Sequence, residues 1–267
     1  MRRVLVLTAY FMLLINVNIF AGVEVPKHSW DLGAEMSHIT YKEPDVMEEK
    51  GMMYGLAGFY AYRSGVVFKT DGRLSFGQLD YSSDVSGSMD NIDDLIVEAR
   101  ETAGFAMSIS DTVLITPYIG LGYRYLNDDS SEMVTSTGAR GYERESNYFY
   151  SPIGIECLRG YSDGWSYGFT VEYDYFIKGV QKSHLSDANL GFADLENDQN
   201  NGYGFRASLK FKRENKRANF VIEPFVRYWN IKKSEEQPVS FSGVIIGTGY
   251  EPKNNSTEIG IKLAVKF

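Results

Sequence analysis

The sequence predicts an all-β protein: a transmembrane antiparallel up-and-down β-barrel of ten strands, with strands extended above the outer leaflet of an outer membrane. Two observations predict this fold. Apolar and polar residues alternate with a period of two along several segments, as they do in strands with one apolar and one polar face. The connectors between these segments are alternately long and short, which is typical of barrels with long outer loops and short periplasmic turns.

The composition excludes several other classes of protein. The chain has 267 residues, of which 43% are hydrophobic and 14% aromatic, and an aromatic content this high argues against a disordered chain. Its mean hydropathy of -0.26 argues against a helical membrane protein. The single cysteine, Cys157, permits neither an intramolecular disulfide nor a cysteine-rich zinc module. We therefore expect no cofactor and no metal site built from cysteines.

The N-terminus has the pattern of a secretory signal peptide. Arg2 and Arg3 precede an apolar run over residues 4–20, which we interpret as part of a signal peptide of residues 1–21. The alternative is a retained transmembrane anchor. Cleavage leaves a barrel domain of residues 22–267 in the outer membrane of a Gram-negative cell. It also removes two basic charges and so lowers the formal net charge from -8 to -10, which disfavours nucleic acid as a partner.

Ten segments carry the period-two pattern with varying clarity. In order they are 30–41, 52–63, 66–81, 95–109, 113–125, 147–158, 165–175, 203–212, 219–231 and 258–267. The alternation slips at His38 and Ile39, and Glu101 falls on an apolar face; both exceptions would be tolerated above the lipid band. The long connectors are expected at 42–51, 82–94, 127–146, 178–202 and 232–256, and the short ones at 64–65, 110–112, 159–164 and 213–218.

Aromatic residues gather near the predicted strand ends. Such residues form girdles at the two membrane interfaces of outer-membrane barrels. The predicted girdle residues are Trp30, Trp165 and Phe267 at the short-turn end, and Tyr123, Tyr125, Tyr173, Tyr175 and Trp229 toward the long-loop end. The alternative is a soluble β-barrel or sandwich in which these aromatic side chains form the core.

If the apolar side chains face lipid, the opposite face of the strands carries charges of both signs. The predicted lumen charge network consists of Asp31, Glu35, Lys69, Asp71, Arg73, Glu98, Arg100, Arg124, Glu156, Glu172, Asp174, Arg206, Lys210, Glu223, Arg227, Glu258 and Lys262. A ten-stranded cylinder is narrower than barrels that enclose an aqueous channel, so these side chains are expected to interlock and plug the lumen. The alternative is a narrow selective channel or a proton pathway.

The chain resembles the omptin-like superfamily of outer-membrane barrels. The resemblance rests on residues 30–37, 117–121, 123–125 and 260–267, and on ten strands with tall outward extensions. The final Phe267 after alternating apolar residues also resembles the signal read by the barrel-assembly machinery, which the resemblance therefore implies as a partner.

Omptins are surface proteases, and the resemblance implies a specific set of candidate residues. The family uses two aspartates on one wall of the rim and an Asp-His pair on the other, which together activate a water molecule. The matching candidates are Asp80 and Asp84 near the second long connector, and His184 with Asp187 in the fourth. His184 lies three residues ahead of Asp187 rather than just behind an acidic partner, so this sequence departs from the family pattern where catalysis would occur.

We therefore interpret the protein as a non-enzymatic surface barrel. Its plugged lumen and long acidic loops would serve envelope structure, or contact with a host or ligand. The expected partners are outer-membrane lipid, lipopolysaccharide and a cationic extracellular ligand. Residues 82–94 illustrate the acidity, because they contain four aspartates and no lysine or arginine. Asp90, Asp93 and Asp94 do not have the spacing of an EF-hand loop, so a solvated acidic surface is favoured over a metal site.

Overall fold

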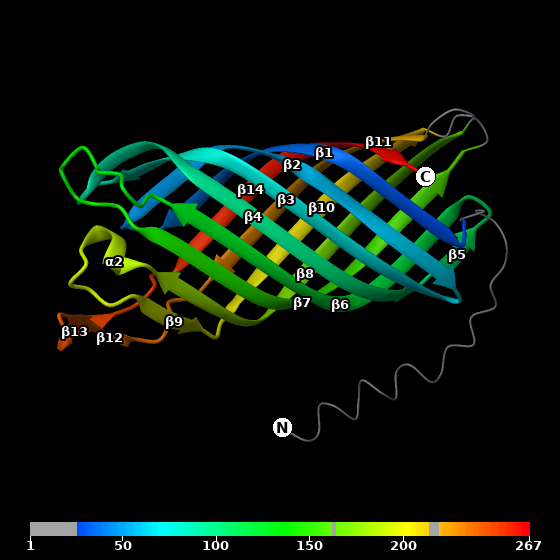
Figure 1. Cartoon of the computed structure of the whole chain (residues 1–267). Coiled ribbons are helices and arrows are strands. Elements are labelled where there is room, and N and C mark those ends of the chain that lie inside the picture. Colours follow the sequence, from blue (N-terminus) through cyan, green and yellow to red (C-terminus); the bar gives the residue numbers. More distant parts are fainter. Residues whose placement is uncertain (1–25, 162–163, 214–218) are drawn as a thin grey trace, which may run out of the picture.

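The computed structural model describes residues 26–161, 164–213 and 219–267, and these residues are almost entirely strands (Figure 1). The predicted signal peptide of residues 1–21 lies outside the described residues. The elements are β1 (His28–Glu43), β2 (Met47–Ser64), β3 (Val66–Ser83), β4 (Gly87–Phe105), β5 (Met107–Ser110), β6 (Val113–Asp129), β7 (Glu143–Gly160), β8 (Trp165–Ser183), α2 (Leu185–Ala188), β9 (Leu195–Gln199), β10 (Gly202–Arg213), β11 (Asn219–Ile231), β12 (Gln237–Phe241), β13 (Val244–Gly249) and β14 (Asn254–Lys266).

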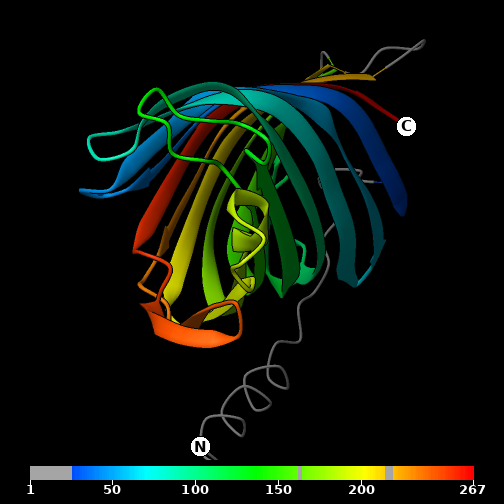
Figure 2. The ribbon, with the colours of Figure 1, turned by 60° about the vertical axis from the view of Figure 1, so that its left-hand side comes forward.

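Ten of these strands close into a barrel. The order around the wall is β1, β2, β3, β4, β6, β7, β8, β10, β11 and β14, and β14 pairs with β1 to complete the ring. All of these pairings are antiparallel, and the ring of strands is visible in Figure 2. Strand β5 pairs with the first residues of β6, and β9 pairs with the last residues of β8. Strands β12 and β13 form a separate two-stranded hairpin. The predicted fold class and strand number are confirmed.

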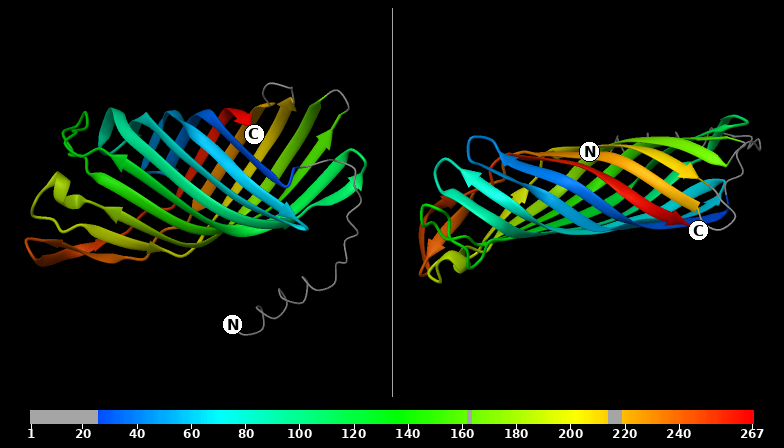
Figure 3. Two further views of the ribbon diagram at one scale, coloured as in Figure 1. Left: turned by 45° about the vertical axis from the view of Figure 1, so that its right-hand side comes forward. Right: turned by 90° about the horizontal axis from the view of Figure 1, so that it is seen from above.

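The two ends of the barrel differ. Strand β1 begins and β14 finishes at one end, which we call the inner end, beside the tight turn at Gly65. The opposite, outer end carries α2, β9 and the β12–β13 hairpin (Figures 1 and 3). Among the described residues, no helix is long and apolar enough to span a membrane.

Large apolar side chains cover the outside of the barrel. On three neighbouring strands, Phe169, Phe205 and Ile222 are 45%, 42% and 46% exposed, although side chains of these types are most often buried in soluble proteins. An exposed apolar band on a closed barrel fits the hydrocarbon interior of a membrane. The alternative of a soluble barrel or sandwich, with these side chains in its core, is therefore wrong.

Above this band the outward faces become polar while the strands continue. His38, Lys50, Gln78 and Asp93 point outward on β1 to β4 and are exposed. The first two outer connections are consequently short turns at 44–46 and 84–86, so the predictions of long connectors at 42–51 and 82–94 are wrong. The slip at His38 and Ile39 marks the level at which the strands leave the apolar band.

Glu101 does not follow this explanation. It lies on β4 four residues from the inner end of that strand, faces outward, and accepts a hydrogen bond of 2.6 Å from the Thr70 hydroxyl. The expectation that Glu101 lies above the lipid band is therefore wrong, and the Thr70 hydroxyl provides a polar partner on the apolar face instead.

An apolar layer crosses the inside of the barrel toward the outer end. Its buried side chains come from seven strands and form two clusters that both pack against Leu126 of β6; they are Ile39, Met53, Leu79 and Ile96 in one cluster, and Tyr148, Tyr150, Phe176, Trp229 and Ile231 in the other. Gly122 makes room for this layer, because a Cβ atom there would lie 2.3 Å from the Tyr150 ring. The interior therefore consists of an apolar layer toward the outer end and charged side chains below it.

Candidate functional site

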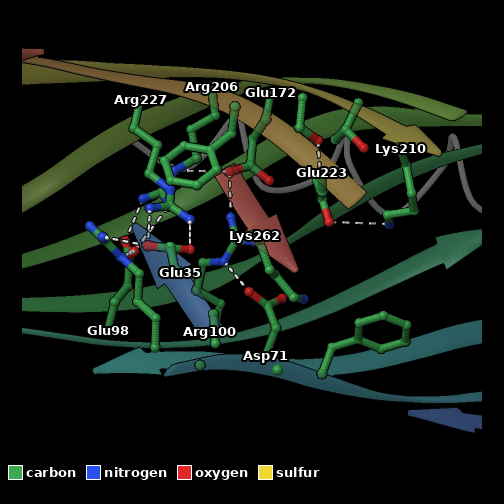
Figure 4. Close-up of a pocket in the computed structure, with 18 of the residues that line it drawn as sticks. Glu35, Asp71, Glu98, Arg100, Glu172, Arg206, Lys210, Glu223, Arg227 and Lys262 are labelled. Atoms are coloured by element: carbon green, nitrogen blue, oxygen red, sulfur yellow. Dashed lines mark hydrogen bonds and ion pairs between the residues drawn. The ribbon is translucent and has the colours of Figure 1, made fainter. Parts of the chain in front are cut away.

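The centre of the lumen is held by interlocking arginines and glutamates (Figure 4). The Arg73 guanidinium donates hydrogen bonds to Glu98 at 2.9 Å and to Glu258 at 2.8 Å, and it also lies 3.4 Å from Glu35. Arg227 binds Glu35 through two hydrogen bonds of 2.7 and 2.8 Å. These contacts join β1, β3, β4, β11 and β14, so the charges connect opposite parts of the wall.

Arg206 on β10 is the centre of a second group of hydrogen bonds in the lumen. Its guanidinium donates to Asp174 at 2.7 Å, to both carboxylate oxygens of Glu98, and to the Tyr150 hydroxyl at 3.0 Å. Asp174 is fully buried, and Glu98 is 3% exposed. A buried carboxylate is tolerated only when it is paired in this way, so Arg206 is central to the stability of the interior.

All seventeen residues of the predicted lumen charge network face the interior. The sequence reasoning missed three further inward-facing cations, namely Arg63, Lys212 and Lys266. Lys212 and Lys266 continue the inward faces of β10 and β14 beyond Lys210 and Lys262, and Arg63 lies on the inward face of β2, so the period-two pattern could have identified them. With these three, the described interior below the apolar layer contains eleven basic and nine acidic side chains.

The predicted aromatic girdles need one correction. Trp30 and Phe267 stack at the inner end with ring centroids 4.0 Å apart, and Tyr173 and Tyr175 are exposed farther up the wall. Trp229, in contrast, is only 2% exposed. It shares the inward face of β11 with Phe225 and Arg227, packs edge-on against Tyr150, and belongs to the apolar layer. The prediction that Trp229 is a girdle residue is wrong.

Acidic side chains gather around Arg144 above the apolar layer. The Arg144 guanidinium donates to Glu43 at 2.5 Å and to Glu251 at 2.7 Å, and Asp128 lies 3.9 Å away. Burial raises the pKa of Glu251 to about 7, although Arg144 opposes the shift. Burial, reinforced by Asp128, likewise raises the pKa of Glu49. We call Glu43, Glu49, Asp94, Asp128, Arg144 and Glu251 the rim cluster.

An open groove lies beside the rim cluster, between the first two outer turns. It has a volume of about 410 Å³ and is lined by residues of both turns and by Ser136 of the third loop. Its charged lining consists of four carboxylates and one ammonium group, those of Glu43, Asp45, Glu48, Asp84 and Lys42. Asp84, a protease candidate from the sequence, therefore belongs to this groove, which we call the acidic groove.

The protease candidates do not assemble as the family pattern implies. Asp80 is an exposed residue of β3 and accepts a hydrogen bond from the backbone of Asn91. Asp187 accepts one from the backbone of Glu143. No contact in the described part of the chain joins Asp80 or Asp84 to His184. Asp80 and Asp84 thus belong to the β3–β4 hairpin, whereas His184 follows β8.

The carboxylate that holds His184 is Asp194. The His184 Nδ1 atom lies 3.3 Å from Asp194 Oδ2, and Ser186 donates a 2.7 Å hydrogen bond to the same carboxylate. The Nε2 atom is buried without a hydrogen-bond partner among the described residues, and Glu145 Oε2 is 4.0 Å from it. The proposed pairing with Asp187 is therefore wrong. The loop containing α2 folds back and brings together residues ten positions apart, which local spacing could not reveal.

The acidic residues of the rim do not form a recognisable cation site. Asp93 accepts a hydrogen bond from Gln78, and within the described ranges no three histidine, cysteine, aspartate or glutamate residues are arranged to hold a metal ion.

Comparison with solved structures identifies the architecture. No protein-family model matches the chain, and no curated protein sequence is similar to it. The outer-membrane protease OmpT from Escherichia coli superposes with a TM-score of 0.61 over 90% of this chain and 96% of that protein, at 8% sequence identity. The chain shares the fold of that outer-membrane barrel. Two other outer-membrane proteins are much less similar. The Pseudomonas putida toluene transporter TodX has a TM-score of 0.36 and 10% identity, over 91% of this chain and 90% of that protein. The β domain of the Bordetella autotransporter BrkA has a TM-score of 0.35 and 10% identity, over 88% of this chain and 98% of that domain.

Proposed function

We propose that the protein is an outer-membrane surface barrel that binds a cationic ligand at its outer rim. The observation that carries this proposal is the acidic groove. Of its four carboxylates, those of Asp45 and Asp84 form no ion pair within the described residues, whereas Glu43 binds Arg144 and Glu48 binds Lys42. Beneath the groove, the apolar layer and the charge network occupy the lumen, which favours a binding scaffold over a pore. Residues on outer turns of a rigid barrel are well placed for contact with ligands.

The same proposal includes the route to the membrane. The apolar band on the barrel surface would contact outer-membrane lipid and lipopolysaccharide, after export directed by a signal peptide of residues 1–21. Phe267, exposed and stacked on Trp30 at the inner end, would be read by the barrel-assembly machinery. The inner end would then face the periplasm, as expected for a barrel with both termini at that end.

A binding measurement tests the function. We expect a lysine-rich peptide to bind the refolded barrel with an affinity that falls as salt is raised, because the attraction is electrostatic and screened. Replacing both Asp45 and Asp84 by Asn should weaken binding by about tenfold, equivalent to about 1.4 kcal/mol. Replacing the exposed Asp111 at the inner end by Asn is the control. Binding that is insensitive to salt, or equal in all three proteins, would contradict the proposal.

A second candidate function is peptide hydrolysis, and the geometry of His184 favours it. A carboxylate lies at Nδ1, and the buried Nε2 atom has no hydrogen-bond partner among the described residues, which are two features of a histidine that acts as a general base. If this site is active, refolded protein in lipopolysaccharide should cleave a basic peptide. His184→Ala and Asp194→Asn should each reduce the rate by at least about a hundredfold, whereas Asp187→Asn should retain activity. An absence of cleavage across a panel of basic peptides would eliminate this candidate.

A further inference from the structure

The inner half of the lumen contains a cavity toward which three lysines converge. The cavity has a volume of about 120 Å³, more than a single water molecule needs. The ammonium groups of Lys69, Lys210 and Lys262 come from three different strands and lie 5.0, 5.7 and 5.8 Å from the centre of the Phe59 ring. In Figure 4, Lys210 lies beside Glu223, away from the Arg227–Glu35 pair.

These lysines are paired less closely than the arginines above them. Lys69 is 4.0 Å from Asp71, a carboxylate that Arg100 already binds at 2.6 Å. Lys210 lies 3.6 Å from Glu156 and 4.0 Å from Glu223. Lys262 alone has a short ion pair, at 2.7 Å to Asp31. The Lys69 and Lys210 ammonium groups therefore retain capacity to donate hydrogen bonds into the cavity.

The surrounding charge is positive. Of the charged residues that line the cavity, seven are basic and five are acidic. In a water-poor lumen, an excess of positive charge attracts a compensating anion more strongly than it would at an exposed surface.

Access is from the inner end. A second cavity shares Lys69, Arg100 and three other lining residues with the first, and it continues past Arg63 and Leu158 near the ends of β2 and β7. On the other side, the apolar layer separates the first cavity from the rim cluster. We propose that the inner half of the lumen is a binding site for a small oxyanion, a phosphate or carboxylate group that enters from the periplasmic side and is held by Lys69 and Lys210.

Phosphorus NMR with inorganic phosphate tests this site. Refolded barrel in a zwitterionic detergent should bind phosphate saturably, and the Lys69→Gln/Lys210→Gln double variant should bind it at least about tenfold more weakly. Lys178→Gln/Lys182→Gln, which removes two lysines near the outer end of β8, should bind as the wild type does. If acetate displaces the bound phosphate, the site accepts oxyanions in general. If acetate does not displace it, the site is specific for phosphate.

Two results would overturn the proposal: no saturable binding of either phosphate or acetate, or equal affinity in the wild type and the Lys69→Gln/Lys210→Gln variant. Gel migration before and after boiling establishes that each variant is folded. If the double variant does not fold, Lys69→Gln alone decides the question, because Lys69 has no short ion pair in the described interior and its side chain is 27% exposed. Peptide binding at the acidic groove is measured separately, so the two proposals can fail independently.

Discussion

Replacing Arg206 by Met is expected to destabilise the barrel by about 3–5 kcal/mol, because it removes one partner from a buried ionic network. Asp174 would lose its guanidinium partner, and Glu98 would retain Arg73. Both carboxylates are almost completely buried, so losing the guanidinium would leave their charges poorly compensated in the interior. The loss can be measured from the urea concentration at which the refolded barrel loses its characteristic migration in unboiled gels.

Arg140→Met is the matched control. Arg140 is exposed on the third outer loop, so its replacement should change stability by less than about 0.5 kcal/mol. If Arg206→Met were equally harmless, the charges in the lumen would contribute nothing to holding the wall together, and the interior network would be a by-product of the fold.

The second large effect expected is a loosening of the outer rim as pH rises. Glu251 has a pKa of about 7 in the folded protein, above its ordinary value of 4.5, so the folded rim binds more protons than the unfolded chain between these values. Its contribution is present below about pH 4.5 and is lost as the pH rises through about 7, by up to about 3 kcal/mol. The raised pKa values of Glu49 and Asp94 act in the same direction.

Hydrogen exchange of the loop over 232–253 should reveal this loosening. After correction for the intrinsic pH dependence of exchange, the loop should be less protected at pH 8 than at pH 5. Glu251→Gln should flatten the difference, whereas Glu236→Gln on the exposed side of the same loop should preserve it. Protection that increases with pH, or an unchanged slope in Glu251→Gln, would show that the rim cluster does not hold the loop.

The barrel itself could be predicted from sequence because the membrane imposes a simple rule on each strand. Where a strand crosses the apolar band, outward residues such as Leu209 and Leu263 are apolar and inward residues such as Lys210 and Lys262 are polar. This gives an alternation that needs no knowledge of neighbouring strands. The same rule predicted the inward charges, and it extends to Arg63, Lys212 and Lys266 at the inner end.

Above the band the rule reverses, which explains the errors. Ile39 and Leu79 face inward there, while Lys50 and Asp80 face outward. A reading that assigns apolar residues to the outside therefore ends each strand too early and interprets its upper part as a loop. Trp229 was misplaced for the same reason, since an aromatic residue near the outer end can pack inside as well as outside.

The candidate residues of the outer loops could not be predicted by spacing. The contact of His184 with Asp194 depends on the short α2 turn and on pairing of β8 with β9. Likewise, the rim cluster combines side chains from β1, β2, β4, β6, β7 and the last loop, and its composition depends on strand register. Such sites become visible only when the tertiary arrangement is known.

The central claim is that apolar side chains of the barrel face lipid while the charges face a closed interior. Spin labels placed singly at positions 207, 208 and 209 of β10, with Cys157 replaced by Ser, test it directly in lipid bilayers. Labels at 207 and 209 should be accessible to oxygen, which concentrates in lipid, and the label at 208 should be much less accessible to oxygen. Equal accessibility at all three positions, or oxygen access only at 208, would contradict the claim.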